Sequence, residues 1–172
     1  NKVIEFFQND YIVVVNVVNS AHGFGISQDI HQKLLACGTD VVILCNLVFV
    51  QRETLVFIER EPNLIRPLNW PAGCPGRGTC MVETAKGQRV LVMNAMGRVM
   101  IEPMLDDPFP AVGKELDQCR LGRDCDAILI DFHAEVSSEK MAMGHYVDGR
   151  ASLLVGTHTH VPTSDHQILP GG

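Results

Sequence analysis

Runs of β-branched and other apolar residues alternate with helical patterns along this chain, and the alternation constrains its fold more than any other feature. Residues 11–15 (Tyr-Ile-Val-Val-Val) are typical of a strand buried on both faces, and residues 40–44 form a second apolar run. Between them, Ser27 is placed to cap a helix that stops at Gly38. Strands separated by helices build layered sheets, so the pattern predicts a layered α/β or α+β domain.

The rest of the chain continues this pattern with one interruption. A second helix is expected over residues 51–58, and the prolines and glycines of residues 67–78 predict a loop. Two strand-like runs, 79–84 and 89–93, are close enough to form a hairpin. After an irregular stretch at 105–110, the expected elements are a helix, a strand (127–130), a helix (137–147) and a strand (153–155). No repeat or linker divides the sequence, so residues 1–172 are expected to form a single domain.

Composition excludes several classes of protein. The chain has 172 residues, of which 46% are hydrophobic, enough for one sizeable core. A net charge of −6 argues against a surface that coats nucleic acid. No apolar run approaches the length of a membrane span. The six cysteines show no Cys-x-x-Cys spacing, which favours reduced thiols and a cytoplasmic location.

The patterns at both ends of the sequence are typical of secondary-structure elements that continue beyond it. Residues 1–8 are typical of the tail of a helix, and residues 170–172 form a turn that no further element follows. We therefore expect the domain to be incomplete at both termini.

Three histidines stand close to the ends of predicted strands. His133 follows the run 127–130, and His158 and His160 follow the run 153–155. Ligands and metals bind beyond the carboxyl ends of strands in layered α/β proteins, and an extended backbone would point His158 and His160 to the same side. Neutral imidazoles are common ligands of transition metals. The pattern is equally compatible with a polar surface loop.

Acidic residues near these histidines have two interpretations. Asp131 either orients His133 or caps the end of its strand. Glu135 and Glu139 are expected to stabilise the first turn of the following helix, where carboxylates are favourable.

Several short motifs are more specific than these general patterns. The sequence resembles the YmdB-like family of calcineurin-type metallophosphoesterases over essentially its whole length. The blocks that carry the resemblance are Asp-Phe-His-Ala-Glu at 131–135, Gly-Thr-His-Thr-His at 156–160, Asp-Gly-Arg at 148–150, Asn-Ala-Met-Gly-Arg at 94–98 and Asn-Ser-Ala-His-Gly at 19–23.

The resemblance implies a cytoplasmic enzyme with a four-layer αββα fold and two metal ions. The implied reaction is hydrolysis of phosphoesters, with 2′,3′-cyclic nucleotides as the substrate class. One implied metal site matches Asn46, His133 and His158, and the other matches Asn19 and His160. Iron or manganese would suit these mixed ligands best, with zinc or magnesium as alternatives.

This chain departs from the family pattern at several functional positions. Val18 stands where the family has a bridging glutamate, and Leu47 stands where it has a proton-donating histidine. The first strand, which carries a metal-binding aspartate in the family, has no counterpart. Without a bridging carboxylate two divalent ions repel each other, so fewer than two ions are expected. A mononuclear site of His133, His158 and Asn46 remains.

Two functions follow from these observations. The first is a metal-dependent phosphodiesterase or phosphatase for a small phosphoester or cyclic-nucleotide substrate, which His22 would help to bind unless it is a structural turn residue. The second is a catalytically inactive relative that acts as a binding or scaffold protein, or a non-functional fragment. Either is compatible with a homo-oligomer, and neither requires a membrane.

Overall fold

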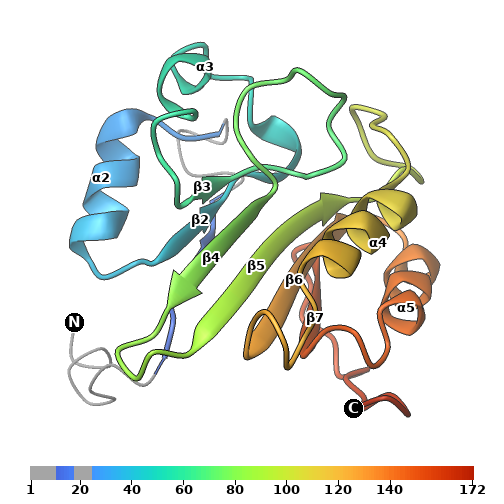
Figure 1. Cartoon of the computed structure of the whole chain (residues 1–172). Helices are drawn as coiled ribbons and strands as arrows, with labels where there is room; N and C mark the ends of the chain where they lie inside the picture. Colours follow the sequence, from blue (N-terminus) through green and yellow to red (C-terminus); the bar gives the residue numbers. More distant parts are fainter. Residues whose placement is uncertain (1–10, 18–24) are drawn as a thin grey trace.

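Two sheets face each other at the centre of the protein (Figure 1). The computed structural model describes residues 11–17 and 25–172. The first sheet is parallel throughout and has the order β1-β2-β3. The second has the order β4-β5-β6-β7, in which β4 and β5 are antiparallel and the other pairs are parallel. The strands are β1 (Val14–Asn16), β2 (Val41–Ile43), β3 (Leu64–Ile65), β4 (Thr79–Glu83), β5 (Arg89–Met96), β6 (Ala127–Ala134) and β7 (Leu153–His158).

Helices cover the outer faces of both sheets, so the domain has four layers. Figure 1 shows α2 and α3 on the side of the first sheet and α4 and α5 on the side of the second. The resulting αββα order confirms the fold expected from the sequence. The helices of the described residues are α2 (Gln28–Ala36), the 3-10 helix η1 (Cys45–Leu47), α3 (Thr54–Phe57), α4 (Pro108–Gln118) and α5 (Ser137–Tyr146).

Three apolar clusters fill the spaces between these layers. Val42 of β2 packs toward α2, whereas its neighbours Val41 and Ile43 pack between the two sheets. The third cluster joins the outer face of the second sheet, including Phe132, to α4 and α5. Side chains of a strand alternate between its faces, which explains why β2 is apolar without interruption.

Several elements begin and end at the residues predicted from the sequence. The Ser27 side chain accepts a hydrogen bond from the Ile30 amide at 3.3 Å and begins α2. The helix ends before Gly38, whose φ of 91° suits a residue without a Cβ. The predicted loop at 67–78 and the β4–β5 hairpin are also present.

Other elements differ from expectation. The first strand covers only Val14–Asn16 and is half-buried, because it lies at the edge of its sheet instead of its centre. The helix expected over 51–58 is the short α3. Asp107 caps α4 at the Phe109 amide, so a helix begins within the stretch expected to be irregular.

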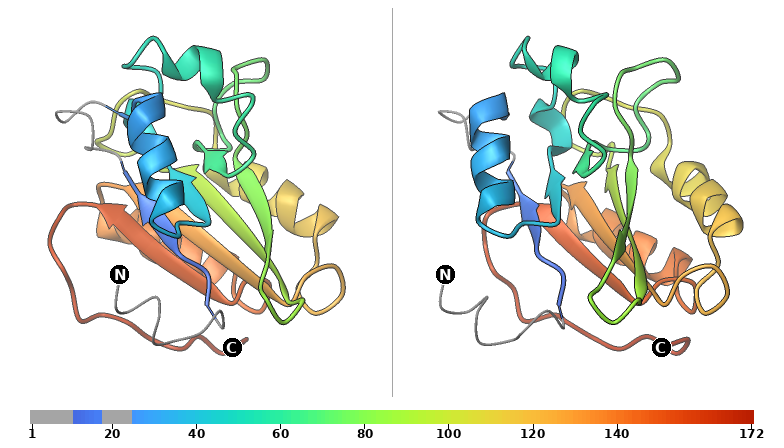
Figure 2. Two further views of the ribbon diagram at one scale, coloured as in Figure 1. Left: turned by 90° about the vertical axis from the view of Figure 1, so that its left-hand side faces the viewer. Right: turned by 60° about the vertical axis from the view of Figure 1, so that its left-hand side comes forward.

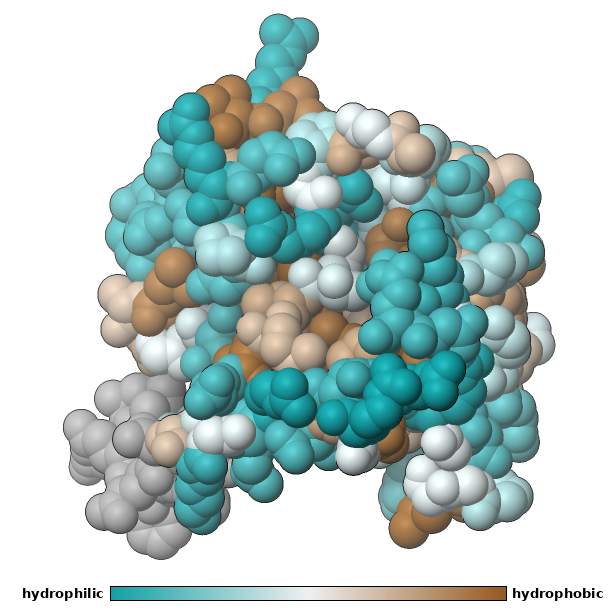
Figure 3. All heavy atoms as spheres, viewed as in Figure 1, coloured by the Kyte–Doolittle hydropathy of each residue, from teal (hydrophilic) through white to brown (hydrophobic). Residues whose placement is uncertain are grey.

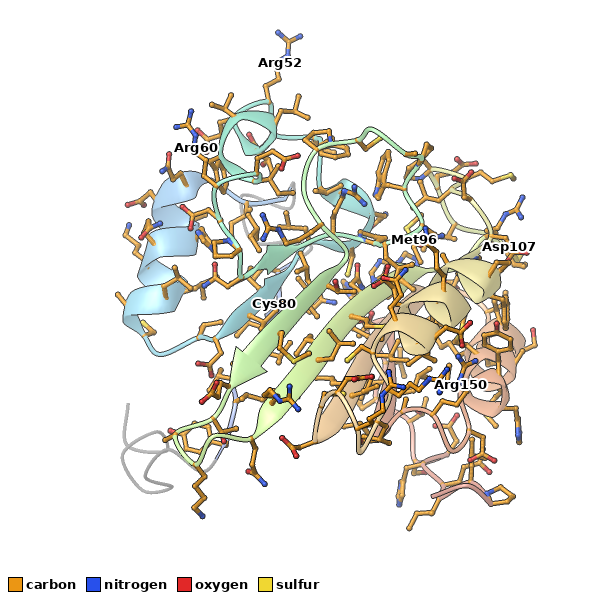
Figure 4. All side chains as sticks on the ribbon, viewed as in Figure 1. Arg52, Arg60, Cys80, Met96, Asp107 and Arg150 are labelled. Carbon is orange, nitrogen blue, oxygen red and sulfur yellow. The ribbon has the colours of Figure 1, made fainter. Side chains whose placement is uncertain are left out.

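The last two strands are longer than expected. β6 and β7 continue through the histidines, so His133 and His158 lie within the final residues of strands rather than beyond them. Figure 2 shows the segment after β7 running along the outside of the molecule, and residues 159–172 form no helix or strand. Figure 4 shows Arg150 beside α4, where its guanidinium contacts Asp117 at 2.7 Å and so ties the end of α5 to α4.

The face drawn in Figure 3 is largely hydrophilic, with small separate apolar patches. None of the helices within residues 11–17 and 25–172 is long and apolar enough to cross a membrane.

Arg66 organises the long loop between β3 and β4. Its side chain is only 7% exposed and donates hydrogen bonds to four backbone carbonyls. The acceptors are the carbonyls of Pro67, Cys74, Pro75 and Gly76. Burial lowers the pKa of the Arg66 guanidinium. Its planar group of N–H donors binds the carbonyls of the loop and so fixes the loop conformation.

Replacing Arg66 with Met should therefore destabilise the protein. The change leaves several carbonyls unpaired, which should lower the free energy of unfolding by about 2–4 kcal/mol in urea titrations. Arg77→Met is a matched control, because Arg77 is exposed and donates to a single carbonyl, that of Glu59. Equal losses for the two variants would contradict this role of Arg66.

Candidate metal centre

His133 and His158 meet at the carboxyl ends of neighbouring parallel strands. The β6–β7 register pairs His133 with Thr157 and Ala134 with His158. Across this pairing, His133 Nε2 lies 3.2 Å from His158 Nδ1, and the rings are tilted by 79°. The two imidazoles therefore point nitrogen atoms at one another.

Asn46 brings a third polar atom to the same point from the other sheet. It belongs to η1, which follows β2. Cys45, the first residue of η1, has a φ of 51° and changes the direction of the chain. The amide Oδ1 lies 3.2 Å from His133 Nε2. Its Nδ2 donates to the Glu102 carbonyl at 3.3 Å, so the oxygen is the atom that faces the histidines.

A hydrogen-bond chain fixes the tautomer of His133. The Thr157 hydroxyl donates its one proton to Asp131 Oδ1 at 2.6 Å. Its oxygen lies 3.0 Å from His133 Nδ1 and can only accept there, so Nδ1 carries the proton. His133 Nε2 is then left with a lone pair.

Glu135 fixes the tautomer of His158 in the same way. Its Oε2 lies 3.1 Å from His158 Nε2, and an ionised carboxylate only accepts hydrogen bonds. His158 Nε2 therefore carries a proton, and in the neutral tautomer Nδ1 carries the lone pair. With both imidazoles neutral, three acceptor atoms, one each from His133, His158 and Asn46, face each other at this point.

This arrangement fits a bound cation. Converging lone pairs repel unless a positive charge lies among them, and imidazole nitrogens with an amide oxygen are ligands for a divalent transition metal. Hydrogen bonds from ligands to carboxylates and hydroxyls are the usual surroundings of metal-binding histidines. His133, His158 and Asn46 are the residues that could hold such an ion.

Asp131 connects the two sheets beneath the histidines. It is almost fully buried, and it accepts from Thr157 at one oxygen and from Asn16 Nδ2 of β1 at the other, at 2.7 Å. Burial raises the pKa of Asp131, and the bonds from Thr157 and Asn16 oppose that shift. Of the two roles considered from the sequence, the contacts fit the one in which Asp131 orients His133, through Thr157.

Electrostatics keep His133 neutral. Burial lowers its pKa to about 3, and the nearby His158, Lys140 and His160 contribute in the same direction. An imidazole must be neutral to bind a metal, so His133 is in its ligand form at physiological pH.

A pocket of about 570 Å³ opens beside this cluster. His160 lines it together with His133 and His158, but the extended backbone expected between His158 and His160 is not formed. Both residues have a positive φ instead, 100° for His158 and 54° for His160. Within residues 11–17 and 25–172, no group of three or more His, Cys, Asp or Glu side chains is placed to hold a metal ion, so the candidate site depends on the Asn46 amide as its third ligand.

Some positions expected to be functional lie outside the described residues, namely Val18, Asn19 and His22. Leu47 is half-buried on η1 directly after Asn46 and offers no acid or base. No sequence pattern indicated that Thr157 would contact His133, since only strand register places them side by side.

Of the two glutamates expected at the first turn of α5, Glu139 lies there and Glu135 does not. Glu135 precedes the helix and binds His158 instead. Glu139 accepts from the backbone amides of Arg98 at 2.8 Å and Val99 at 3.3 Å, and so holds the loop after β5. That loop includes Glu102, whose carbonyl positions Asn46.

Comparison with solved structures gives the class of this fold. A crystal structure described as a novel phosphatase from Mycoplasma pneumoniae matches with a TM-score of 0.85 and 31% identity, over 99% of this chain and 60% of that one. A hypothetical protein from Thermus thermophilus matches with a TM-score of 0.87 and 40% identity, over 99% of this chain and 64% of that one. The fold is thus one found in a phosphatase.

The chain belongs to the YmdB-like protein family, which matches residues 1–172. It is 43% identical over 162 residues to the 2′,3′-cyclic-nucleotide 2′-phosphodiesterase of Bacillus subtilis (strain 168), covering 94% of this chain and 60% of that protein. The chain thus spans about three fifths of the length of that relative.

Acid should destabilise the metal-free protein through His133. Its pKa is about 3 when folded against 6.5 for an ordinary imidazole, so below about pH 6.5 the unfolded chain takes up a proton that the folded chain does not. This contribution to stability is complete above pH 6.5 and is lost as the pH falls towards 3, by about 3 kcal/mol between pH 7 and pH 4.

His133→Gln should remove that part of the acid sensitivity, as measured by urea unfolding at both pH values with a chelator present. His145→Gln is the control, because His145 is exposed on α5. Parallel pH profiles for the parent and His133→Gln would show that His133 does not bind a proton differently in the two states.

Proposed function

We propose that this chain forms the metal-binding part of a phosphodiesterase for small phosphoesters, with 2′,3′-cyclic nucleotides as the substrate class. The observation that carries the proposal is the convergence of lone pairs from His133, His158 and Asn46 beside an open pocket. The name of the Bacillus subtilis relative supports the substrate class.

The donor set suits one divalent ion of the manganese or iron type, in a calcineurin-like phosphoesterase site, with zinc or magnesium as alternatives. When bound, such an ion polarises a phosphoryl oxygen and makes water a better nucleophile near neutral pH. The residues of this chain bind and orient: Thr157 and Glu135 hold the tautomers of the two histidines, and Asn46 is held by Glu102. We also propose a cytoplasmic location, which is supported by the six free cysteines.

A second function is favoured by the residue next to Asn46. Leu47 cannot donate a proton to a leaving group, and loss of a general acid typically lowers rates by about 10²–10⁴-fold. Val18 cannot bridge two ions. A catalytically inactive relative that binds phosphoesters, or that serves as a scaffold, would tolerate both residues.

The proposed metal site can be tested by removing the hydrogen bond that fixes the tautomer of His133. Thr157→Val removes the acceptor for the Nδ1 proton, so it should weaken manganese or zinc binding by about 10–100-fold in calorimetric titrations. Thr159→Val is a matched control, because Thr159 lines the same pocket but its hydroxyl contacts Lys140, at 3.4 Å, rather than a histidine.

Equal metal affinities for the two variants would show that the Asp131–Thr157–His133 hydrogen bonds do not contribute to metal binding. Failure of the parent protein to bind any of these metals would overturn the proposal itself.

Restoring the two family residues tests the catalytic function. Val18→Glu should raise metal affinity because it adds a carboxylate, whereas Leu47→His alone should add little turnover, because a proton donor needs a positioned nucleophile. The double variant should gain more than the sum of the single variants. The measurement is hydrolysis of bis-p-nitrophenyl phosphate with manganese for all four proteins. Robust activity from Leu47→His alone, with no effect of Val18→Glu, would refute this account.

A further inference from the structure

The described walls of the pocket beside the candidate metal centre contain no Asp, Glu, Lys or Arg side chain. Among the described residues, its lining consists of Asn16, Val17, His133, Pro162, Val161 and the run 156–160. A phosphodiester carries a negative charge that such walls do not offset, and an unpaired charge is costly in a partly buried site. A cation at the rim would therefore matter for binding.

Lys140 of α5 lies against β7 and reaches this rim. Its aliphatic stem lies against Gly156, where a Cβ would be 2.7 Å from Lys140 Cδ and 3.3 Å from its Cε. Any other residue at position 156 would push the stem away. Lys140 Nζ lies 3.4 Å from the hydroxyl of Thr159, which is part of the pocket wall.

The ammonium group of Lys140 is not paired with a carboxylate. Glu135 is engaged with His158, and Glu139 binds the backbone amides of Arg98 and Val99. The hydrogen bond from the Thr163 hydroxyl lowers the pKa of the exposed Asp165, and the charge of Lys140 makes a smaller contribution in the same direction. In the described part of the chain, no carboxylate lies within ion-pair distance of Lys140 Nζ. The long contact with a neutral hydroxyl leaves donors of the ammonium available.

We propose that Lys140 binds a non-bridging phosphoryl oxygen of the substrate at the rim of the pocket, and that Gly156 provides the space this requires. The proposal rests on the proposed phosphoesterase function and adds a substrate-binding residue to it. A lysine is a strongly hydrated point charge, suited to an anion that enters from solvent.

The test is binding of inorganic phosphate, measured by calorimetry at low ionic strength with and without manganese. Lys140→Met keeps the apolar stem and should weaken binding about ten-fold, the usual value of a hydrogen bond to a charged group. Lys140→Arg should keep most of the affinity. Gly156→Ala should weaken binding while thermal unfolding shows the fold intact.

Lys33→Met is the matched control, since Lys33 is exposed on α2 and pairs with Asp29. Phosphate affinity of Lys140→Met equal to that of the control would overturn the proposal, and so would a parent protein that binds no phosphate.

Hydrolysis of bis-p-nitrophenyl phosphate distinguishes the role of Lys140 from the proposed hydrolytic function. Lysine-dependent phosphate binding without turnover in any variant would support the role of Lys140 and reject the hydrolytic function. Turnover with an unchanged KM in Lys140→Met would support the function and reject the role of Lys140.

Discussion

The buried carboxylate of Asp131 is the constraint on which the geometry of the candidate centre depends. It lies on β6 between the two sheets and accepts from Asn16 of the first sheet and from Thr157 of β7. A carboxylate is buried at low cost only when hydrogen bonds surround it, so Asp131 requires both partners in place. Its bond to Thr157 then determines which nitrogen of His133 carries the proton. Asp131 therefore links the packing of the two sheets to the tautomer of His133.

The three proposed ligands are each held by a neighbouring group. Asp131 contacts His133 through Thr157, Glu135 contacts His158, and the Glu102 carbonyl accepts from Asn46. This arrangement favours the proposal of a single divalent ion, because two ions without a bridging carboxylate would repel each other. A site of that kind would hold fewer ions than the family resemblance implies, and its phosphate-binding capacity would depend more on residues such as Lys140.

Elements with local signals were predicted well, and elements defined by their neighbours were not. The Ser27 cap and Gly38 fix both ends of α2 because each acts within one turn of the chain. The extent of β6 was underestimated, because Asp131 and His133 are polar and the sequence shows no reason for them to continue a strand. They do so because β5 and β7 pair with β6 on both sides and satisfy its backbone. The first strand was overestimated, because its apolar residues lie at a sheet edge with one neighbour.

The sequence by itself determined the layered fold class and the family, and it identified the two histidines and the asparagine that meet at the site. The two histidines follow apolar runs that form neighbouring parallel strands, whose carboxyl ends share one edge of the sheet, whereas the family resemblance indicated Asn46. Tertiary structure alone decided that Thr157 and Glu135 fix the histidine tautomers and that the chain leaves the extended conformation between His158 and His160. Those outcomes depend on strand register and on two backbone angles, which are set by pairing between segments far apart in the chain and leave no local pattern to detect.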